Sequence, residues 1–209
     1  MTEAQNRFPG LLLAGGQSRR MGGGAKFLQP LGGQTMLSRI IKTVKLQTSE
    51  VILNINIDPQ GIENIDIPVV PDVVSGFAGP LSGILTGLEY FIEKGNTASH
   101  MLSVPTDAPF IPRDLARRLA ARLDGSENQI IMAESIGRVH PVIALWPLSL
   151  AAELRTALVD EDLRKILVFA DRYTRINVVW EEHEGDPFFN INTPEDLAEA
   201  EKRCRRQAN

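Results

Sequence analysis

Short apolar runs alternate with amphipathic stretches along the chain. Apolar runs bounded by glycine, proline or polar residues predict buried strands of a parallel sheet. Apolar residues spaced three and four positions apart predict helices that pack one face against that sheet. The predicted strands are 10–14, 51–57, 68–71, 100–104, 129–133, 141–146 and 174–180, and the predicted helices are 35–47, 80–94, 112–123, 148–159, 163–172 and one that begins at 194. This order favours an α/β fold with a largely parallel sheet and crossover helices.

Two of the predicted helices carry start signals. Pro80 suits the first helical position, where its missing N–H costs nothing. Near the carboxyl end, Thr193 suits an N-cap and Pro194 the first position. Glu195 and Asp196 then place negative charge in the first turn, where the helix dipole favours it.

The composition is that of an ordinary globular protein. The chain has 209 residues, of which 43% are hydrophobic and 23% charged. It shows no internal repeat and no low-complexity linker. We therefore expect one domain over residues 1–209, with an ordered core of about 8–203.

Cysteine content, hydropathy and charge narrow the class of protein. The single cysteine, Cys204, excludes a disulfide framework and a cysteine-based metal site, and it suits a reducing cytosol. No apolar stretch reaches the about 20 residues that cross a bilayer, and the amino terminus lacks the apolar region of a secretory signal. The net charge of -4 argues against a general nucleic-acid binder. We expect a cytoplasmic protein that binds neither a membrane nor nucleic acid.

The loop after the first predicted strand is rich in glycine and basic residues. Residues 15–24 have the sequence Gly-Gly-Gln-Ser-Arg-Arg-Met-Gly-Gly-Gly, and Lys26 follows. Glycine lets backbone N–H groups come close to a bound group, and arginine and lysine add positive charge beside them. The loop therefore favours a bound polyphosphate, with a glycine turn that binds nothing as the alternative.

This loop fits neither of the two common phosphate-binding fingerprints. Walker A requires Gly-Lys followed by serine or threonine, but Lys26 stands between Ala25 and Phe27. The dinucleotide pattern Gly-x-Gly-x-x-Gly fails because Gly22-x-Gly24 leads to Phe27. The chain is therefore neither a P-loop ATPase nor an ordinary NAD-binding protein.

An aspartate follows another predicted strand, and ligands of open α/β sheets collect at the carboxyl ends of strands. Asp107 lies between Pro105 and Pro109, in a loop that the prolines stiffen. Mg²⁺ often takes only one or two protein carboxylates and completes its shell with water and substrate phosphates. Asp107 is thus a candidate metal ligand, and the alternative is an aspartate that caps a turn.

Further polar side chains stand at strand ends. Asn54 and Asn56 alternate with apolar residues, so they share one face of the second strand. Asparagine is poor in strands, which indicates ligand contact or a buried hydrogen-bond network. Asp72 ends the third strand, and Asn190 and Asn192 repeat the spacing of two before the last helix, where Asn192 could simply lead into the N-cap.

Two glycines and one histidine complete the candidates. Gly79 and Gly83 flank the start of helix 80–94, and a helical glycine costs about 1 kcal/mol relative to alanine. Either a ligand or a neighbouring element approaching closely would explain Gly83. His140 stands alone, because the three histidines are scattered without zinc spacing. We find no convincing serine, histidine and acid set, so hydrolase-type nucleophilic catalysis is not supported.

Three segments together resemble the molybdenum cofactor guanylyltransferases, the MobA family. They are Leu-Ala-Gly-Gly-Gln-Ser-Arg-Arg-Met-Gly at 13–22 with Lys26, Pro-Thr-Asp-Ala-Pro-Phe-Ile-Pro at 105–112, and Asn-Ile-Asn-Thr-Pro-Glu-Asp-Leu at 190–197. The resemblance runs from Leu11 to about Leu197. The pair Gly15-Gly16 favours the guanylyl branch, since related cytidylyltransferases more often have Ala-Ala-Gly there.

The resemblance implies a three-layer, Rossmann-like nucleotidyltransferase fold with a mostly parallel sheet. It implies transfer of GMP from GTP to molybdopterin-bound molybdenum, which forms the molybdopterin guanine dinucleotide cofactor and releases pyrophosphate. Mg²⁺ is the implied cofactor, and GTP and the molybdopterin cofactor are the implied substrates. Candidate protein partners are cofactor-delivery proteins and molybdoenzyme chaperones.

Carried over position by position, the resemblance also implies residue roles. Lys26 would hold the phosphates, Asp107 would bind Mg²⁺ and GTP, and Arg20 would help them to stabilise the transition state. The implied nucleotide contacts are Leu13, Ala14, Gly15, Lys26, Asn54, Asp72 and Asp107, and the positions nearer to phosphate or acceptor are Arg20, Gly23, Gly79, Gly83, Asn190 and Asn192. The family often has aspartate where this chain has Ala25, which leaves open how Lys26 is held.

The chemistry agrees with this set of residues, because a phosphate monoester is a nucleophile at neutral pH and needs no serine–histidine pair. The nearest alternative is a related nucleotidyltransferase that uses CTP or a sugar-phosphate acceptor. A nucleotide-binding regulatory or carrier protein without catalysis is the second. A structural α/β domain whose loop holds nothing is the third.

Overall fold

The fold is built on one central sheet. The computed structural model describes residues 7–14, 25–56, 62, 65–76, 79–182 and 185–208. In these residues seven strands form a sheet in the order β5-β4-β1-β6-β8-β7-β9, and β2 and β3 form a separate hairpin. The strands are β1 (Gly10–Leu13), β2 (Pro30–Leu31), β3 (Gln34–Thr35), β4 (Val51–Asn54), β5 (Val69–Val70), β6 (His100–Pro105), β7 (Ile130–Ser135), β8 (Arg138–Pro147) and β9 (Arg175–Trp180). All pairings in the large sheet are parallel except those of β8.

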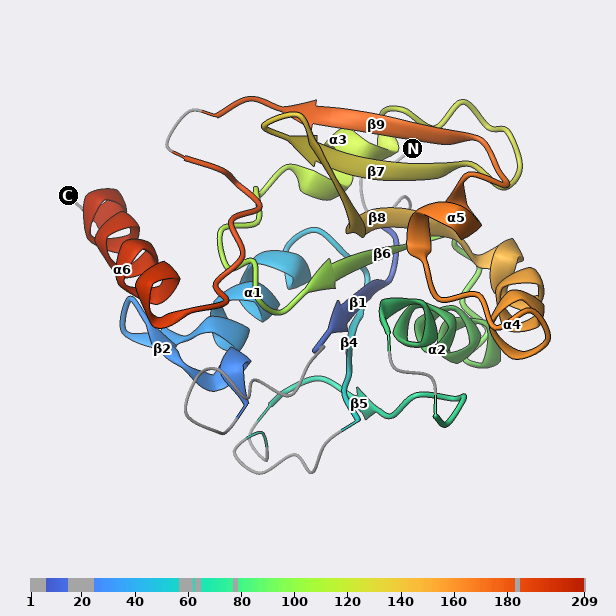
Figure 1. Cartoon of the computed structure of the whole chain (residues 1–209), viewed down its shortest axis with the longest axis horizontal. Coiled ribbons are helices and arrows are strands. Elements are labelled where there is room, and N and C mark those ends of the chain that lie inside the picture. Colours follow the sequence, from blue (N-terminus) through green and yellow to red (C-terminus); the bar gives the residue numbers. More distant parts are fainter. Residues whose placement is uncertain are drawn as a thin grey trace.

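Helices cover both faces of the sheet (Figure 1). The α-helices are α1 (Met36–Lys45), α2 (Pro80–Glu93), α3 (Leu115–Ala120), α4 (Ala151–Val159), α5 (Ile166–Ala170) and α6 (Pro194–Ala208), and short 3-10 helices lie at η2 (Lys26–Leu28) and η3 (Leu148–Leu150). Residues of α1 and α3 share one buried cluster with the sheet, and residues of α2, α4 and α5 share the other. The predicted α/β class, with three layers and a mostly parallel sheet, is confirmed.

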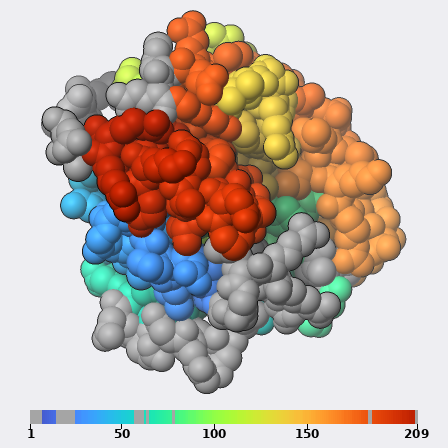
Figure 2. All heavy atoms as spheres, turned by 60° about the vertical axis from the view of Figure 1, so that its left-hand side comes forward, coloured from blue at the N-terminus to red at the C-terminus, as the bar shows by residue number. Residues whose placement is uncertain are grey.

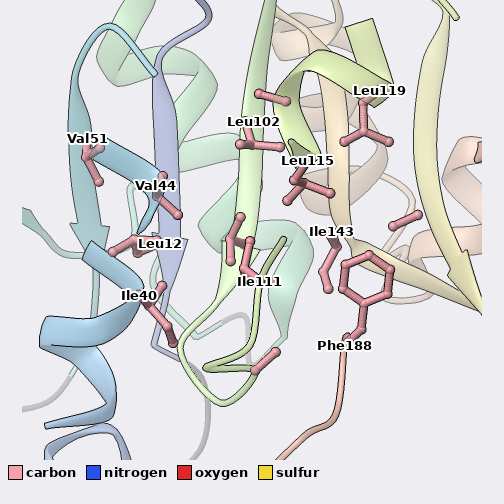
Figure 3. Packing of buried hydrophobic residues seen from close by; sticks show 14 of the residues in the cluster. Leu12, Ile40, Val44, Val51, Leu102, Ile111, Leu115, Leu119, Ile143 and Phe188 are labelled. Atoms are coloured by element: carbon pink, nitrogen blue, oxygen red, sulfur yellow. The ribbon is translucent and has the colours of Figure 1, made fainter. Parts of the chain in front are cut away.

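The cluster beneath α1 and α3 reaches the lower end of the sheet in the close view (Figure 3). Leu12 of β1 packs with Ile40 and Val44 of α1, and all three are fully buried. Phe188, from the segment before α6, packs near Ile143 of β8 at the other end of this cluster. The burial of Phe188 thus holds the segment before α6 against the sheet.

Helix α2 packs closely against the sheet at Gly83, where a side chain would not fit. A Cβ atom on Gly83 would stand 2.3 Å from Leu13 Cδ2 and 2.4 Å from Asn54 Oδ1. One turn later, a Cβ on Gly87 would stand 2.6 Å from Met101 Sδ. Of the two explanations that the sequence allowed for Gly83, the structure supports close helix–sheet packing.

Two hairpins were not predicted. Ile136 and Gly137 connect β7 to β8 with positive φ values of 51° and 65°, which suits a two-residue turn between antiparallel strands. The strand predicted at 141–146 therefore begins earlier, at Arg138, and runs against its neighbours. Gly32 and Gly33 make a similar turn between β2 and β3, with φ values of 58° and 81°.

Several predicted elements end early. The strand predicted at 51–57 ends at Asn54, and helices 112–123 and 163–172 shorten to α3 and α5. After α3 the chain continues with hydrogen bonds that span three residues, such as the one from Leu123 N to Ala120 O at 3.1 Å. The end of a helix is defined by its hydrogen bonds, which the spacing of apolar residues does not report.

Helix α6 begins with the predicted cap. Asp196 N donates to Thr193 Oγ1 at 3.1 Å, and Asp196 Oδ2 accepts from Thr193 N at 2.9 Å. The helix then packs on the β2–β3 hairpin, with Ala200 and Cys204 buried against Leu31. Figure 2 shows this contact from outside, with red α6 beside the blue hairpin segment. None of the described helices is both long enough and apolar enough to cross a membrane.

Candidate active site

The parallel strands β1, β4 and β6 end at the same edge of the sheet. Leu13 pairs in register with Asn54 on one side and with Pro105 on the other. Beyond the strands, Ala14 N donates to Asn54 O at 3.0 Å, and Thr106 N donates to Leu13 O at 3.0 Å. The end of β1 at Leu13 and Ala14 is thus fixed directly between the segment of Asn54 and the segment of Asp107.

The side chain of Lys26 lies between Asp107 and Asn192. Its Nζ donates to Asn192 Oδ1 at 2.7 Å and lies 3.3 Å from Asp107 Oδ2. The Lys26 side chain is only 13% exposed, against 31% for Asp107. An ammonium has three N–H groups, so these contacts leave one N–H for another oxygen.

These contacts explain how Lys26 is held with Ala25 before it. Lys26 begins η2, in which Leu28 N donates to Ala25 O at 2.9 Å. Asn192 and Asp107 then orient the ammonium from other parts of the chain. An acidic neighbour at position 25 is therefore not needed to direct this lysine.

One carboxylate oxygen of Asp107 has no partner among the described residues. Its Oδ1 is buried and accepts no hydrogen bond from this part of the chain, while Oδ2 faces Lys26. A buried, unpaired carboxylate oxygen is costly, which indicates that it serves a ligand. Its chemistry fits a hard divalent cation with one protein carboxylate. The described residues contain no group of three or more potential side-chain ligands for a metal.

The third part of the edge is a network around Asp72. The buried Asn54 side chain donates to Asp72 Oδ1 at 2.8 Å and to Val70 O at 3.2 Å. Asn56 Oδ1 accepts from Asp72 N at 2.7 Å. The two asparagines thus hold one aspartate in place, which is the hydrogen-bond network that their spacing allowed.

One contributor to this network was not identified from the sequence. Thr86 Oγ1 accepts from Val73 N at 3.0 Å and donates to Ser82 O at 2.9 Å. It thereby anchors the loop of Asp72 to α2 from a fully buried position. In the sequence, Thr86 is one polar residue on an apolar helix face, and its spacing gives no signal of this role.

The remaining candidates have different outcomes. Gly79 is the N-cap of α2, and Asn190 is half-buried in the segment that Ile191 joins to Asp107 through a 2.9 Å backbone hydrogen bond. Gly15, Arg20 and Gly23 lie outside the described residues.

The structure brings a serine, a histidine and an acid together, which sequence spacing did not reveal. Ser135 Oγ lies 2.7 Å from His140 Nε2 and donates to Asp186 Oδ1 at 2.6 Å. Burial lowers the pKa of His140, although the charge of Asp186 works against this. The serine hydroxyl donates its hydrogen bond to the carboxylate and not to the histidine, so this is not the arrangement of an activated nucleophile.

Comparisons with known proteins agree with this architecture. A family model described as a MobA-like NTP transferase domain matches residues 10–175. The chain is 48% identical over 194 residues to the molybdenum cofactor guanylyltransferase of Bradyrhizobium sp. (strain ORS 278), with 93% of this chain and 92% of that protein covered. It is also 48% identical to the protein of that name from Rhodopseudomonas palustris (strain HaA2), with 95% and 93% covered.

Solved structures share the fold. The crystal structure of molybdopterin-guanine dinucleotide biosynthesis protein A from Archaeoglobus fulgidus superposes with a TM-score of 0.73 at 22% identity. The match covers 95% of this chain and 100% of that one. The similarity therefore extends over nearly the whole length of both proteins.

Proposed function

The chain belongs to the family of MobA-like NTP transferases, and we propose that it transfers GMP from GTP to the molybdopterin-bound molybdenum cofactor and releases pyrophosphate. The observation that carries this proposal is the joint placement of Lys26, Asp107 and Asn192 at the carboxyl edge of the sheet. The ammonium suits the phosphates of a nucleoside triphosphate, and the carboxylate with one unpaired oxygen suits its metal ion. The amide holds the ammonium in place.

The reaction needs alignment and charge stabilisation more than acid–base chemistry. A phosphate oxygen of the acceptor forms a bond to the α-phosphorus of GTP, and the bond from that phosphorus to the oxygen bridging to the β-phosphate breaks. The electron pair leaves with pyrophosphate. We assign to Lys26 the binding of phosphate oxygens through its remaining N–H, because its other contacts fix it at this edge.

Asp107 is the residue that we propose to hold Mg²⁺, through its buried and unpaired Oδ1. Bound there, the ion would neutralise charge on the phosphates and on the leaving pyrophosphate. We assign Asn54 and Asp72 to the guanosine, because their mutual hydrogen bonds hold both at the end of β4, beside the loop that begins at Ala14.

The direct test is pyrophosphate release from GTP and molybdenum-loaded molybdopterin in the presence of Mg²⁺. We expect release from the natural chain and a loss of at least about a hundredfold in Asp107→Asn, which keeps the shape and removes the charge. Asp66→Asn is the matched control, because Asp66 is fully exposed and pairs only with Lys45 at 3.0 Å among the described residues. Normal turnover of Asp107→Asn would overturn the metal assignment.

The same assay separates the alternatives. Release with CTP and not with GTP would refute the choice of base. Release with a simple sugar phosphate in place of molybdopterin would refute the acceptor. A thermal shift with GTP and Mg²⁺ but no release with any acceptor would indicate a binding protein without catalysis.

A further inference from the structure

A hydrogen-bonded chain of three side chains stands beside the candidate active site. His140 Nε2, Ser135 Oγ and Asp186 Oδ1 are linked at 2.7 Å and 2.6 Å. Ser135 is the last residue of β7, which runs in the same direction as β6 because both are antiparallel to β8. Its end therefore lies at the edge of the sheet that carries Asp107.

The late segment of the chain connects the two places. Asp186 begins a stretch that reaches Ile191, whose N–H donates to Asp107 O at 2.9 Å. Asn192 follows and accepts from Lys26. The histidine chain and the lysine–aspartate pair are thus fixed to one stretch of backbone.

Counting protons fixes the tautomer of His140. The Asp186 carboxylate accepts from Ser135 Oγ and also from Phe188 N at 2.9 Å. A serine hydroxyl has one proton, and it is used on Asp186. The bond between Ser135 and His140 therefore requires His140 Nε2 to donate. In the neutral ring, the proton is on Nε2 and Nδ1 has a free lone pair.

The surroundings favour this neutral form and leave Nδ1 open. Burial is the largest influence and lowers the pKa of His140; Arg138 acts in the same direction, while Asp186 and Glu134 oppose it. Among the described residues, Nδ1 makes no hydrogen bond, and His140 is only partly buried. Nδ1 is therefore available to a ligand. The Phe188 ring, 5.0 Å away between centroids, supports the imidazole from one side.

We propose that His140 Nδ1 accepts a hydrogen bond from an N–H of the nucleotidyl acceptor and so orients its fused nitrogen heterocycle. The proposal rests on the proposed function and names one contact for its acceptor. A lone pair would repel an anionic phosphate oxygen, whereas pterin-type rings carry amino and ring N–H donors. The ordered bonds to Ser135 and Asp186 hold the ring in one orientation before the acceptor arrives.

Two variants separate this contact from a structural role. His140→Gln allows an amide N–H to reach Ser135 but removes the acceptor at the place of Nδ1, and His140→Phe removes both. We expect KM for the acceptor to rise about tenfold or more in both variants, with KM for GTP within about twofold of the natural value. If folded His140→Gln has the same KM for the acceptor as the natural chain, the proposal is wrong.

A pH series gives a second readout. Protonation of His140 would fill Nδ1, so the natural chain should lose acceptor affinity on acidification by more than His140→Gln does, since titration of the acceptor itself is common to both. Parallel pH profiles would contradict the contact. If the natural chain releases no pyrophosphate with any acceptor, the proposed function itself has failed. That result is obtained without any variant of His140, so the two failures are distinguishable.

Discussion

Replacing Gly83 by alanine tests the close contact of α2 with the strand ends. The new Cβ would stand 2.3 Å from Leu13 Cδ2 and 2.4 Å from Asn54 Oδ1, so both neighbours must move. Leu13 can shift a terminal methyl group. Asn54 is less free, because its amide donates to Asp72 and to Val70.

The magnitude follows from opposing terms. Alanine gains about 1 kcal/mol over glycine in a helix, whereas overpacking costs about 1–3 kcal/mol. Disturbing one hydrogen bond of Asn54 adds about 1 kcal/mol. The net loss of about 1–3 kcal/mol would lower Tm by about 2–12 °C in a chain of this size.

Two measurements check this prediction, namely the melting temperature and the thermal shift produced by GTP with Mg²⁺. We expect Gly83→Ala to lower Tm and to weaken GTP binding about fivefold, because Asn54 moves. Gly87→Ala is the matched control, since its clash is with Met101 and Leu11 and does not involve Asn54. A Tm equal to that of the natural chain, with GTP binding lost, would refute the packing argument and favour close approach of the ligand.

Two further predictions concern a charge and a proton. Lys26→Ala should slow pyrophosphate release at least tenfold, which corresponds to about 1.4 kcal/mol of barrier. Lys42→Ala, which removes an exposed lysine, should not slow it. If Lys26→Ala is as fast as Lys42→Ala, Lys26 does not bind the phosphates. His100 is buried, which lowers its pKa below the unfolded value of 6.5, so the unfolded chain binds more protons just below that pH. Urea titrations should show stability falling below about pH 6.5 and less steeply in His100→Gln; identical slopes would contradict this.

The strand pattern indicated which candidate residues would lie near one another, but not the contacts that they make. It placed Asn54 near the end of the second strand and Asp72 and Asp107 just after strands, and parallel strands bring their carboxyl ends together by geometry. It could not show that Asn192 supports Lys26, because the two residues are 166 positions apart. Residues that far apart meet only through the complete order of strands.

The missed features have a common physical cause. Apolar spacing reports which face of an element is buried, but not the direction in which a strand runs. The turn at Ile136 and Gly137 reverses β8, and this reversal puts His140 beside Ser135. A positive φ at an isoleucine is rare, so the turn had only Gly137 as a signal.

The partnership of Lys26 with Asn192 has a consequence for the order of events during synthesis. A ribosome adds about 5–20 residues per second, so roughly ten to thirty seconds separate the two residues in time. Through that interval, the growing chain holds the lysine without the amide that later fixes it at 2.7 Å. The Lys26–Asn192 contact therefore forms only after the segment before α6 has been made and has reached the sheet.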